Sequence, residues 1–253
     1  MRGSLPMKTN HVVFVLVSLS SLGAASVQAQ AQEPKIDSAT IARANKPILR
    51  RGELIGVLAT TGIAMAFDKK LLNTISDPHD SFGRSISDFG NALGNGVYVY
   101  PTLLVASVAG KVIGSRAVYG VSSRALKSTL LAGASAMALK FLVGRERPPV
   151  SDNAFKFHPL NFKDSTNSFP SGHTTVAFAL ATSFAREIRG TWDDVFFYAL
   201  ATTTAYARMH DNRHWMSDVV FGAGIGILST RFIHRREAKL LVGKSVLGAS
   251  LEF

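Results

Sequence analysis

Cysteine is absent from the 253-residue chain, and acidic residues are few. Without a thiol the chain can form neither a disulfide nor a thiolate metal site, and it has no cysteine nucleophile. Lys and Arg number 28 against 17 Asp and Glu, which gives a formal net charge of +11. This excess indicates an anionic partner: a nucleic acid, a phosphate ester or an acidic membrane surface. Composition alone does not choose among the three.

Apolar residues, by contrast, are plentiful. Hydrophobic side chains make up 47% of the chain and charged side chains 18%, which excludes an intrinsically disordered or fibrous protein. The length suits one domain with a substantial core. The mean hydropathy of +0.17 is low for a protein with six membrane spans and high for an ordinary soluble enzyme.

The first 29 residues have the pattern of a secretory signal peptide. Arg2 and Lys8 precede a short apolar run at 11–17, and Val27-Gln28-Ala29 suits a cleavage site. An uncleaved membrane anchor is the alternative, but the apolar core is too short for one. We therefore expect residues 1–29 to be removed on export to a bacterial periplasm. Export argues against a nucleic acid as the partner.

Six apolar stretches follow a polar lead-in at 30–51. They are rich in Ala and Leu, and turn signals such as Pro148-Pro149 separate them, which predicts helices rather than strands. We therefore expect an all-α fold, a six-helix bundle over residues 52–236, followed by a C-terminal tail at 237–253. The connection at 144–172 is long, and long irregular connections inside a compact domain are usually functional. The stretches lie at about 54–67, 97–113, 126–143, 174–185, 195–207 and 219–233.

The sequence gives conflicting signals about a membrane. In four of the six stretches the uncharged window is about 12–14 residues, short of the roughly 20 that span a bilayer. Basic residues nevertheless gather beside alternate helix ends, for example at Arg50/Arg51 and Arg235/Arg236, which is the pattern of a six-span protein with its N-terminus inside. A cleaved signal peptide would put that end outside. We expect a periplasmic helical domain that lies on or in the inner membrane surface.

Polar residues that suit an anion site lie in three clusters near predicted helix ends. Ser171-Gly172-His173 opens the fourth helix, where free N–H groups bind anions, although an ordinary capped helix has the same pattern. His214 and Asp218 are four residues apart and share a helix face, so the carboxylate could fix the imidazole tautomer, or the two could form a surface pair. The basic residues that border these clusters are Lys140, Arg147 and Arg208. Together the clusters describe an anion pocket with two histidines.

In this order and spacing, the clusters resemble the motifs of the type 2 phosphatidic acid phosphatase and vanadium haloperoxidase superfamily. The motifs are K-x6-R-P from Lys140, P-S-G-H from Pro170 and R-x5-H-x3-D from Arg208. The resemblance spans roughly residues 85–235. It implies an active site at one end of the bundle, built from helix termini and from the loops between helices three and four and between helices five and six.

The resemblance also implies a role for each matching residue. His214 would be the nucleophile that forms a phosphohistidine, Asp218 would orient it, and His173 would protonate the leaving alcohol and then activate water. Phosphate oxygens would be held by Lys140, Arg147, Ser171, Gly172 and Arg208. No metal or other cofactor is implied.

Three further features bear on this assignment. Ala207 stands where the family usually has Ser, so one hydroxyl near the pocket is missing. His210 and His214 have a spacing that could hold zinc, but no third ligand is evident, so we expect no metal. Arg145 and Arg213 either extend the positive field or lie on a solvated surface.

The expected activity is a metal-independent phosphatase that hydrolyses phosphate monoesters or pyrophosphates of envelope lipids. A vanadate-dependent haloperoxidase is one alternative, although the family's peroxidases are typically longer. A secreted phosphatase of small esters and a non-catalytic anion- or lipid-binding protein are the others. The partners expected are a phosphate-ester substrate and the membrane surface; the sequence does not indicate the oligomeric state.

Overall fold

A computed structural model describes residues 47–76, 80–161, 163–188 and 190–251, with side chains as far as residue 241. The expected signal peptide lies outside these residues. The helices of the described chain are α3 (Arg51–Ile75), α4 (Ser81–Gly94), α5 (Gly96–Val112), α6 (Arg116–Val143), α7 (Gly172–Ile188), α8 (Thr191–His210), α9 (Met216–Leu251) and the short 3-10 helix η1 (Asp164–Thr166).

The expected all-α fold is confirmed. Each of the six apolar stretches lies almost entirely within a helix, and the described residues contain no β-strand beyond one isolated bridge between Arg145 and Phe157. The seventh helix, α4, was not expected, because its sequence SFGRSISDFGNALG has no apolar run. The last helix, α9, continues to Leu251, so most of the expected C-terminal tail is helical.

The helix α7 lies at the centre of the bundle and packs against α4, α6, α8 and α9. Its many Thr and Ser residues can be buried because their hydroxyls donate to carbonyls one turn earlier, as Thr182 does to Phe178 at 2.7 Å. Small residues bring α9 close to it: a Cβ at Gly226 would lie 2.4 Å from the Thr175 carbonyl oxygen. The small residues at 222–226 therefore let α9 pack closely against α7.

Two helices are long and apolar enough to cross a membrane. These are α6 and the Met216–Leu241 part of α9, and α4 with α5, bent by 48° at their junction, would make a third span. The uncharged-window argument was too strict here, because a charged residue within α6 is neutralised: Lys127 pairs with Glu237 of α9 at 2.7 Å. Exposed apolar side chains also cover outward faces of the bundle, including Leu58, Val105 and Leu130. These features indicate membrane association.

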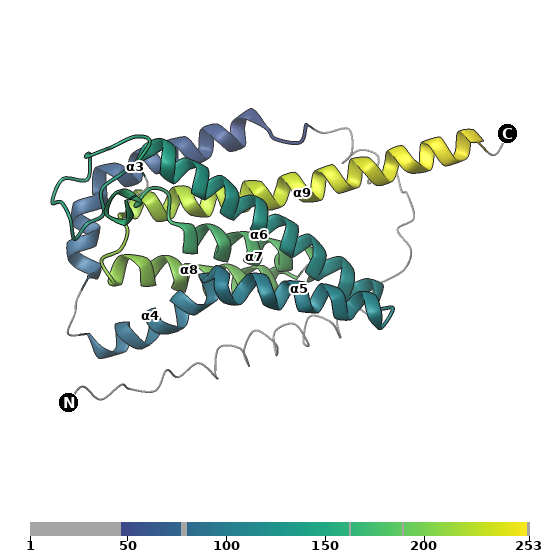
Figure 1. The fold of residues 1–253 in the computed structure, drawn as a ribbon, viewed down its shortest axis with the longest axis horizontal. Helices are drawn as coiled ribbons and strands as arrows, with labels where there is room; N and C mark the ends of the chain where they lie inside the picture. The colour runs from purple at the N-terminus through teal and green to yellow at the C-terminus, as the bar shows by residue number, and fades with distance from the viewer. Residues whose placement is uncertain (1–46, 77–79, 162, 189, 252–253) are drawn as a thin grey trace.

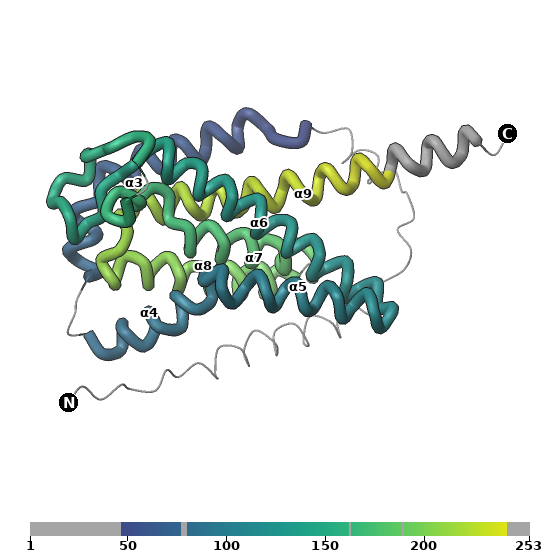
Figure 2. Tube along the Cα trace, in the orientation of Figure 1, coloured from purple at the N-terminus to yellow at the C-terminus, as the bar shows by residue number. Residues whose placement is uncertain are grey.

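The two ends of the bundle differ in chemistry. Figure 1 shows the 144–171 connection and the turn between α8 and α9 at the left end, whereas α9 projects beyond the bundle at the right. The tube in Figure 2 shows that α3, α6 and α8 all run toward the left end. The helices α3 and α6 begin toward the right, at Arg51 and Arg116, and Arg235 of α9 pairs with Glu53 in the first turn of α3. The basic clusters therefore lie opposite the motif residues.

The contact between α4 and α8 depends on glycine, which gives a stability prediction. A Cβ on Gly90 would lie 2.4 Å from the Thr203 carbonyl oxygen, while Thr204 Oγ1 donates to the Gly90 carbonyl at 2.7 Å. We expect Gly90→Ala to lower the free energy of unfolding by about 1–3 kcal/mol, because backbone rather than a flexible side chain must move. Thermal or denaturant unfolding of the purified protein measures this.

Gly56→Ala is the matched control, because a Cβ there meets nothing within 4 Å. That variant should gain stability, by about 0.5–1 kcal/mol, since alanine favours the helix. Equal effects of the two substitutions would contradict the close approach of α4 to α8.

Candidate active site

The predicted site residues gather at the end of the bundle formed by the 144–171 connection and the α8–α9 turn. The helix α6 ends at Val143 and is capped by Gly144, whose φ of +60° favours glycine. A side chain at this position would also collide with the carbonyl oxygen of His158, so no larger residue fits. This turn sends the chain across the end of the bundle before Gly172 starts α7. Lys140 lies in the last turn of α6 and Arg208 in the last turn of α8. Helix ends thus supply the charged groups.

Three cations act together at this end. Nζ of Lys140 donates to the carbonyl oxygen of Asn167 at 2.5 Å, and Nη2 of Arg147 to Oδ1 of Asp164 at 2.9 Å. Nε of Arg208 is buried and has no hydrogen-bond partner among the described residues. Burial lowers the pKa of Arg208 to about 10, and Arg147 acts in the same direction. A partly buried, incompletely neutralised set of cations is a suitable environment for an anion.

His173 faces the same charges at the start of α7. Burial lowers the pKa of its imidazole to about 4, and Arg208, Lys140 and Arg147 each add to the shift. The ring is therefore neutral near neutral pH. A dianion placed among these cations would cancel their effect and raise the pKa of His173 again. The geometry thus couples protonation of this histidine to anion binding.

His214 is the more deeply buried histidine. Its Nδ1 lies 3.4 Å from Oδ2 of Asp218, so the carboxylate faces one ring nitrogen and leaves Nε2 for other contacts. Burial lowers the pKa of His214 to about 3; Lys140 and Arg208 add to that shift, and Asp218 opposes it. The backbone N–H of Trp215 and the hydroxyl of Ser168 donate to the same carboxylate oxygen, at 2.9 and 2.5 Å. Asp218 is therefore held in a fixed orientation.

A buried ion cluster behind Asp218 was not predicted from the sequence. Arg145 is fully buried, and its Nη1 donates to Asp218 Oδ1 while its Nη2 donates to Asp68 Oδ2, both at 2.6 Å. It is therefore neither part of a solvated surface nor free to contact a ligand. Asp68, on α3, also accepts from the backbone N–H and hydroxyl of Ser217, both at 2.7 Å. Burial raises the pKa of Asp68, and the donors from Ser217 and Arg145 oppose that shift.

Comparison with known proteins agrees with this geometry. The sequence profile of the PAP2 superfamily matches residues 123–240, which contain all three motifs. The segment from residue 123 to residue 240 belongs to the PAP2 superfamily. The family resemblance seen in the motifs is therefore confirmed.

Individual relatives extend the comparison. A stretch of 100 residues, 39% of the chain, is 41% identical to lipid A 1-phosphatase from Porphyromonas gingivalis, but the chain spans only about a fifth (20%) of that protein. The fold is similar to Aquifex aeolicus LpxE, with a TM-score of 0.50, 23% identity, and coverage of 65% of this chain and 92% of the other. It is also similar to a transmembrane PAP2-type phosphatidylglycerolphosphate phosphatase from Bacillus subtilis, with a TM-score of 0.53 and 17% identity. This match covers 90% of this chain and 97% of the other.

The unexpected helix α4 also contributes to the PAP2 site. Asn91 accepts from Arg208 Nη1 at 2.6 Å and donates to Asp211 Oδ2 at 2.6 Å, so it joins α4 to the start of the third motif. Ser87 donates to the carbonyl of Ala207, the position where the family usually has Ser. A regular amphipathic face on 81–94 is the one signal that could have shown this helix in the sequence.

The remaining predicted residues occupy supporting positions in the PAP2 site. The Ser171 hydroxyl lies 3.0 Å from Thr174 Oγ1, and the Ser171 N–H donates to the Asp218 carbonyl. Gly172 lies close to Lys140, whose Cε would be 3.7 Å from a built Cβ. His210 contacts Ser87 at 3.2 Å, and the described residues contain no group of three side chains suited to a metal ion.

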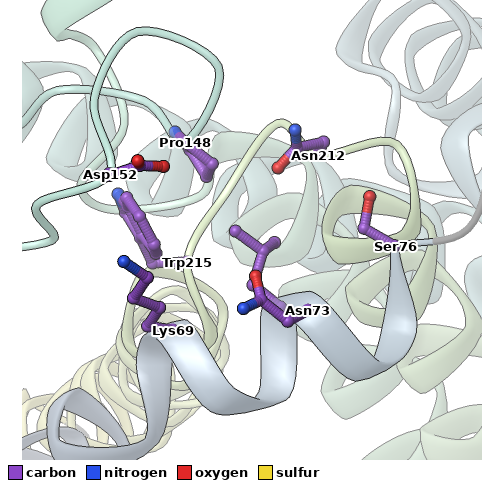
Figure 3. A pocket seen from close by; sticks show the side chains of 8 residues that line it. Lys69, Asn73, Ser76, Pro148, Asp152, Asn212 and Trp215 are labelled. Carbon is purple, nitrogen blue, oxygen red and sulfur yellow. The ribbon is translucent and has the colours of Figure 1, made fainter.

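A polar pocket of about 250 Å³ adjoins the site of the PAP2 domain. Figure 3 shows Lys69 and Asn73 of α3, and Ser76 directly after that helix, on one side of it, with Asp152 and Asn212 from two connections above. Trp215, the neighbour of His214, forms part of its wall and packs on Leu72. None of the residues that line this pocket belongs to the predicted phosphate site.

The lowered pKa values predict an unusual titration. In the ligand-free protein we expect the side-chain 15N resonances of His173 and His214 to show neutral rings from about pH 7 to about pH 5.5, below the ordinary pKa of about 6.5. The unfolded chain binds protons at these rings below about pH 6.5 and the folded chain does not, so the free energy of unfolding should fall as the pH drops toward 4.

Addition of inorganic phosphate provides the control for that titration. It should raise the pKa of His173 by partly neutralising the three cations. Half-protonation of either ring near pH 6.5 without ligand would contradict the arrangement.

Proposed function

We propose that this PAP2 protein is a phosphatase of lipid phosphates that works through a phosphohistidine and needs no metal. One observation carries the proposal: two neutral histidines and three cations meet at one end of a bundle whose flanks are apolar. A neutral imidazole is the nucleophilic form. Convergent cations stabilise the charge on a transferring phosphoryl group, which is the main requirement of such a reaction.

In the first step, Nε2 of His214 attacks phosphorus. A nitrogen–phosphorus bond forms as the bond from phosphorus to the leaving oxygen breaks, and Asp218 stabilises the positive charge that develops on the ring. Lys140, Arg147 and Arg208 bind the remaining phosphate oxygens. His173, protonated once the bound dianion has raised its pKa, gives its proton to the leaving oxygen.

In the second step, water replaces the leaving group. His173, now neutral, takes a proton from the water as its oxygen attacks phosphorus, and the nitrogen–phosphorus bond breaks. Inorganic phosphate and a neutral His214 are released. The same histidine thus serves as acid and then as base.

A lipid substrate is supported by the surface of the chain and by its relatives. The site lies at the end of helices whose flanks suit a bilayer, and exposed Val150, Phe155 and Leu160 project from the connection around it. Relatives named for lipid A and phosphatidylglycerolphosphate agree with a lipid phosphate. A phosphate at the end of an apolar bundle matches the position of a headgroup above its acyl chains.

We further propose that the site faces away from the cytoplasm. The basic clusters lie at the opposite end of the bundle, and Lys and Arg concentrate on the cytoplasmic side of membrane proteins. This orientation agrees with an extracytoplasmic site. It also places the start of α3 inside, so residues 1–29 would then stay on the chain as a further segment rather than be removed.

The catalytic proposal predicts the effect of removing His214. Phosphate release from a panel of lipid phosphates should fall by about a thousandfold or more in His214→Ala, because no nucleophile remains. Excess EDTA should leave wild-type activity unchanged. His158→Ala is the control, since this exposed histidine pairs with Glu146 outside the proposed machinery. Strong activity in His214→Ala, or loss of activity in EDTA, would refute the mechanism.

The absence of cysteine makes the orientation directly measurable. A membrane-impermeant thiol reagent applied to intact spheroplasts should label Lys156→Cys, at the site end, and not Lys111→Cys, at the end of α5. Both positions are exposed, so both should react after the membrane is opened. Labelling of Lys111→Cys alone in intact spheroplasts would reverse the orientation.

A further inference from the structure

Asp68 lies outside the three motifs and outside the part of the chain that matches the family profile. Its side chain is only 1% exposed, and it is joined to Asp218 through Arg145 at two distances of 2.6 Å. Asp218 is in turn 3.4 Å from Nδ1 of His214. A chain of charged groups therefore runs from α3 to the histidine.

The signs of these charges determine how Asp68 affects His214. Asp218 can stabilise a positive charge on His214 only if its own negative charge is not cancelled. Arg145, fully buried beside Asp218, would cancel it in a medium where charges are poorly screened. Asp68 supplies a second negative charge on the far side of Arg145. The three groups together then keep a net charge of −1 next to the ring.

We propose that Asp68 is a positioning residue of the phosphatase, which keeps the Asp218 carboxylate electrostatically available to His214 by neutralising Arg145. The proposal rests on the function proposed above. It assigns a catalytic effect to α3, a helix that contributes no motif residue. Its role differs from that of the cations, because Asp68 affects the charge on His214 and does not contact phosphate.

A purely structural role makes a different prediction. If Asp68 only ties α3 to α9, its loss lowers stability and leaves the chemistry of folded molecules intact. If it sets the charge at Asp218, its loss lowers kcat while KM, which reflects the cations, stays nearly unchanged. Glu53 is a matched control, because it is also a carboxylate on α3 that pairs with α9, through Arg231 and Arg235 at the opposite end.

The test measures kcat and KM for a soluble short-chain lipid phosphate. Asp68→Asn should lower kcat by about tenfold to fiftyfold with KM within about twofold, as expected for one charge lost several ångströms from the reacting ring. Glu53→Gln should lower the melting temperature and leave kcat within about twofold. The double variant Asp68→Asn/Arg145→Gln restores the net charge of −1, so it should recover most of the kcat lost in Asp68→Asn.

Binding provides a readout that does not need turnover. Orthovanadate can form a bond to the attacking nitrogen, whereas inorganic phosphate reports on the cations alone. Asp68→Asn should therefore weaken orthovanadate and leave the affinity for phosphate unchanged. If the wild type binds both anions but releases no phosphate from any lipid, the proposed function fails while the comparison of the two anions still tests Asp68.

Three results would overturn the inference. The first is a kcat of Asp68→Asn within about twofold of wild type, together with unchanged affinity for orthovanadate. The second is a loss of kcat in Glu53→Gln equal to that in Asp68→Asn. The third is a folded double variant whose kcat is lower than that of Asp68→Asn. If the single variant does not fold, a folded double variant whose kcat is more than about a hundredfold below that of the wild type would also overturn the inference.

Discussion

Burial of the Arg145 guanidinium is the constraint on which this end of the bundle depends. A fully desolvated cation is costly unless opposite charges and acceptors surround it, and loss of one partner of such a cluster costs about 3–5 kcal/mol. Here the partners are Asp68 and Asp218, 150 residues apart in the chain, together with the carbonyl oxygen of Ala154 and the hydroxyl of Ser217. These contacts fix α3, the long connection and the start of α9 relative to one another.

The proposed phosphate site differs from this cluster, because positive charge is in excess there. Gly172 of α7 lies close to Lys140 of α6, and the charges of Lys140 and Arg208 both act on the partly desolvated His173. Without an anion, burial and the nearby cations keep His173 neutral, so no further positive charge is added there. Asp68 and Asp218 compensate the buried charge of Arg145 behind the site, whereas the excess of positive charge in front of it would attract an anion.

The sequence predicted those features that short-range patterns carry. Apolar stretches predicted six helices, and the resemblance of the three motifs to the superfamily implied that Lys140, His173 and His214 meet at one end of the bundle. The sequence did not reveal the partners of these residues. In the sequence Asp68 is only the charged residue that follows the apolar stretch at 54–67. Asn91 lies in a helix without an apolar run. A buried ion pair or amide bridge depends on contacts between distant segments, and no local periodicity records such contacts.

The same distinction explains why the uncharged windows did not reveal the helices that are long and apolar enough to cross a membrane. Counting uncharged residues along the chain treats every charge as exposed to lipid, but charges on the helices of a bundle can face one another, as Lys127 and Glu237 do. A charge paired in this way costs far less than one exposed to lipid. The outward faces can then remain apolar while the ends carry the polar chemistry. A lipid phosphate needs both properties, because its chains must stay in the bilayer while its phosphate reaches a water-accessible site at the end of the helices.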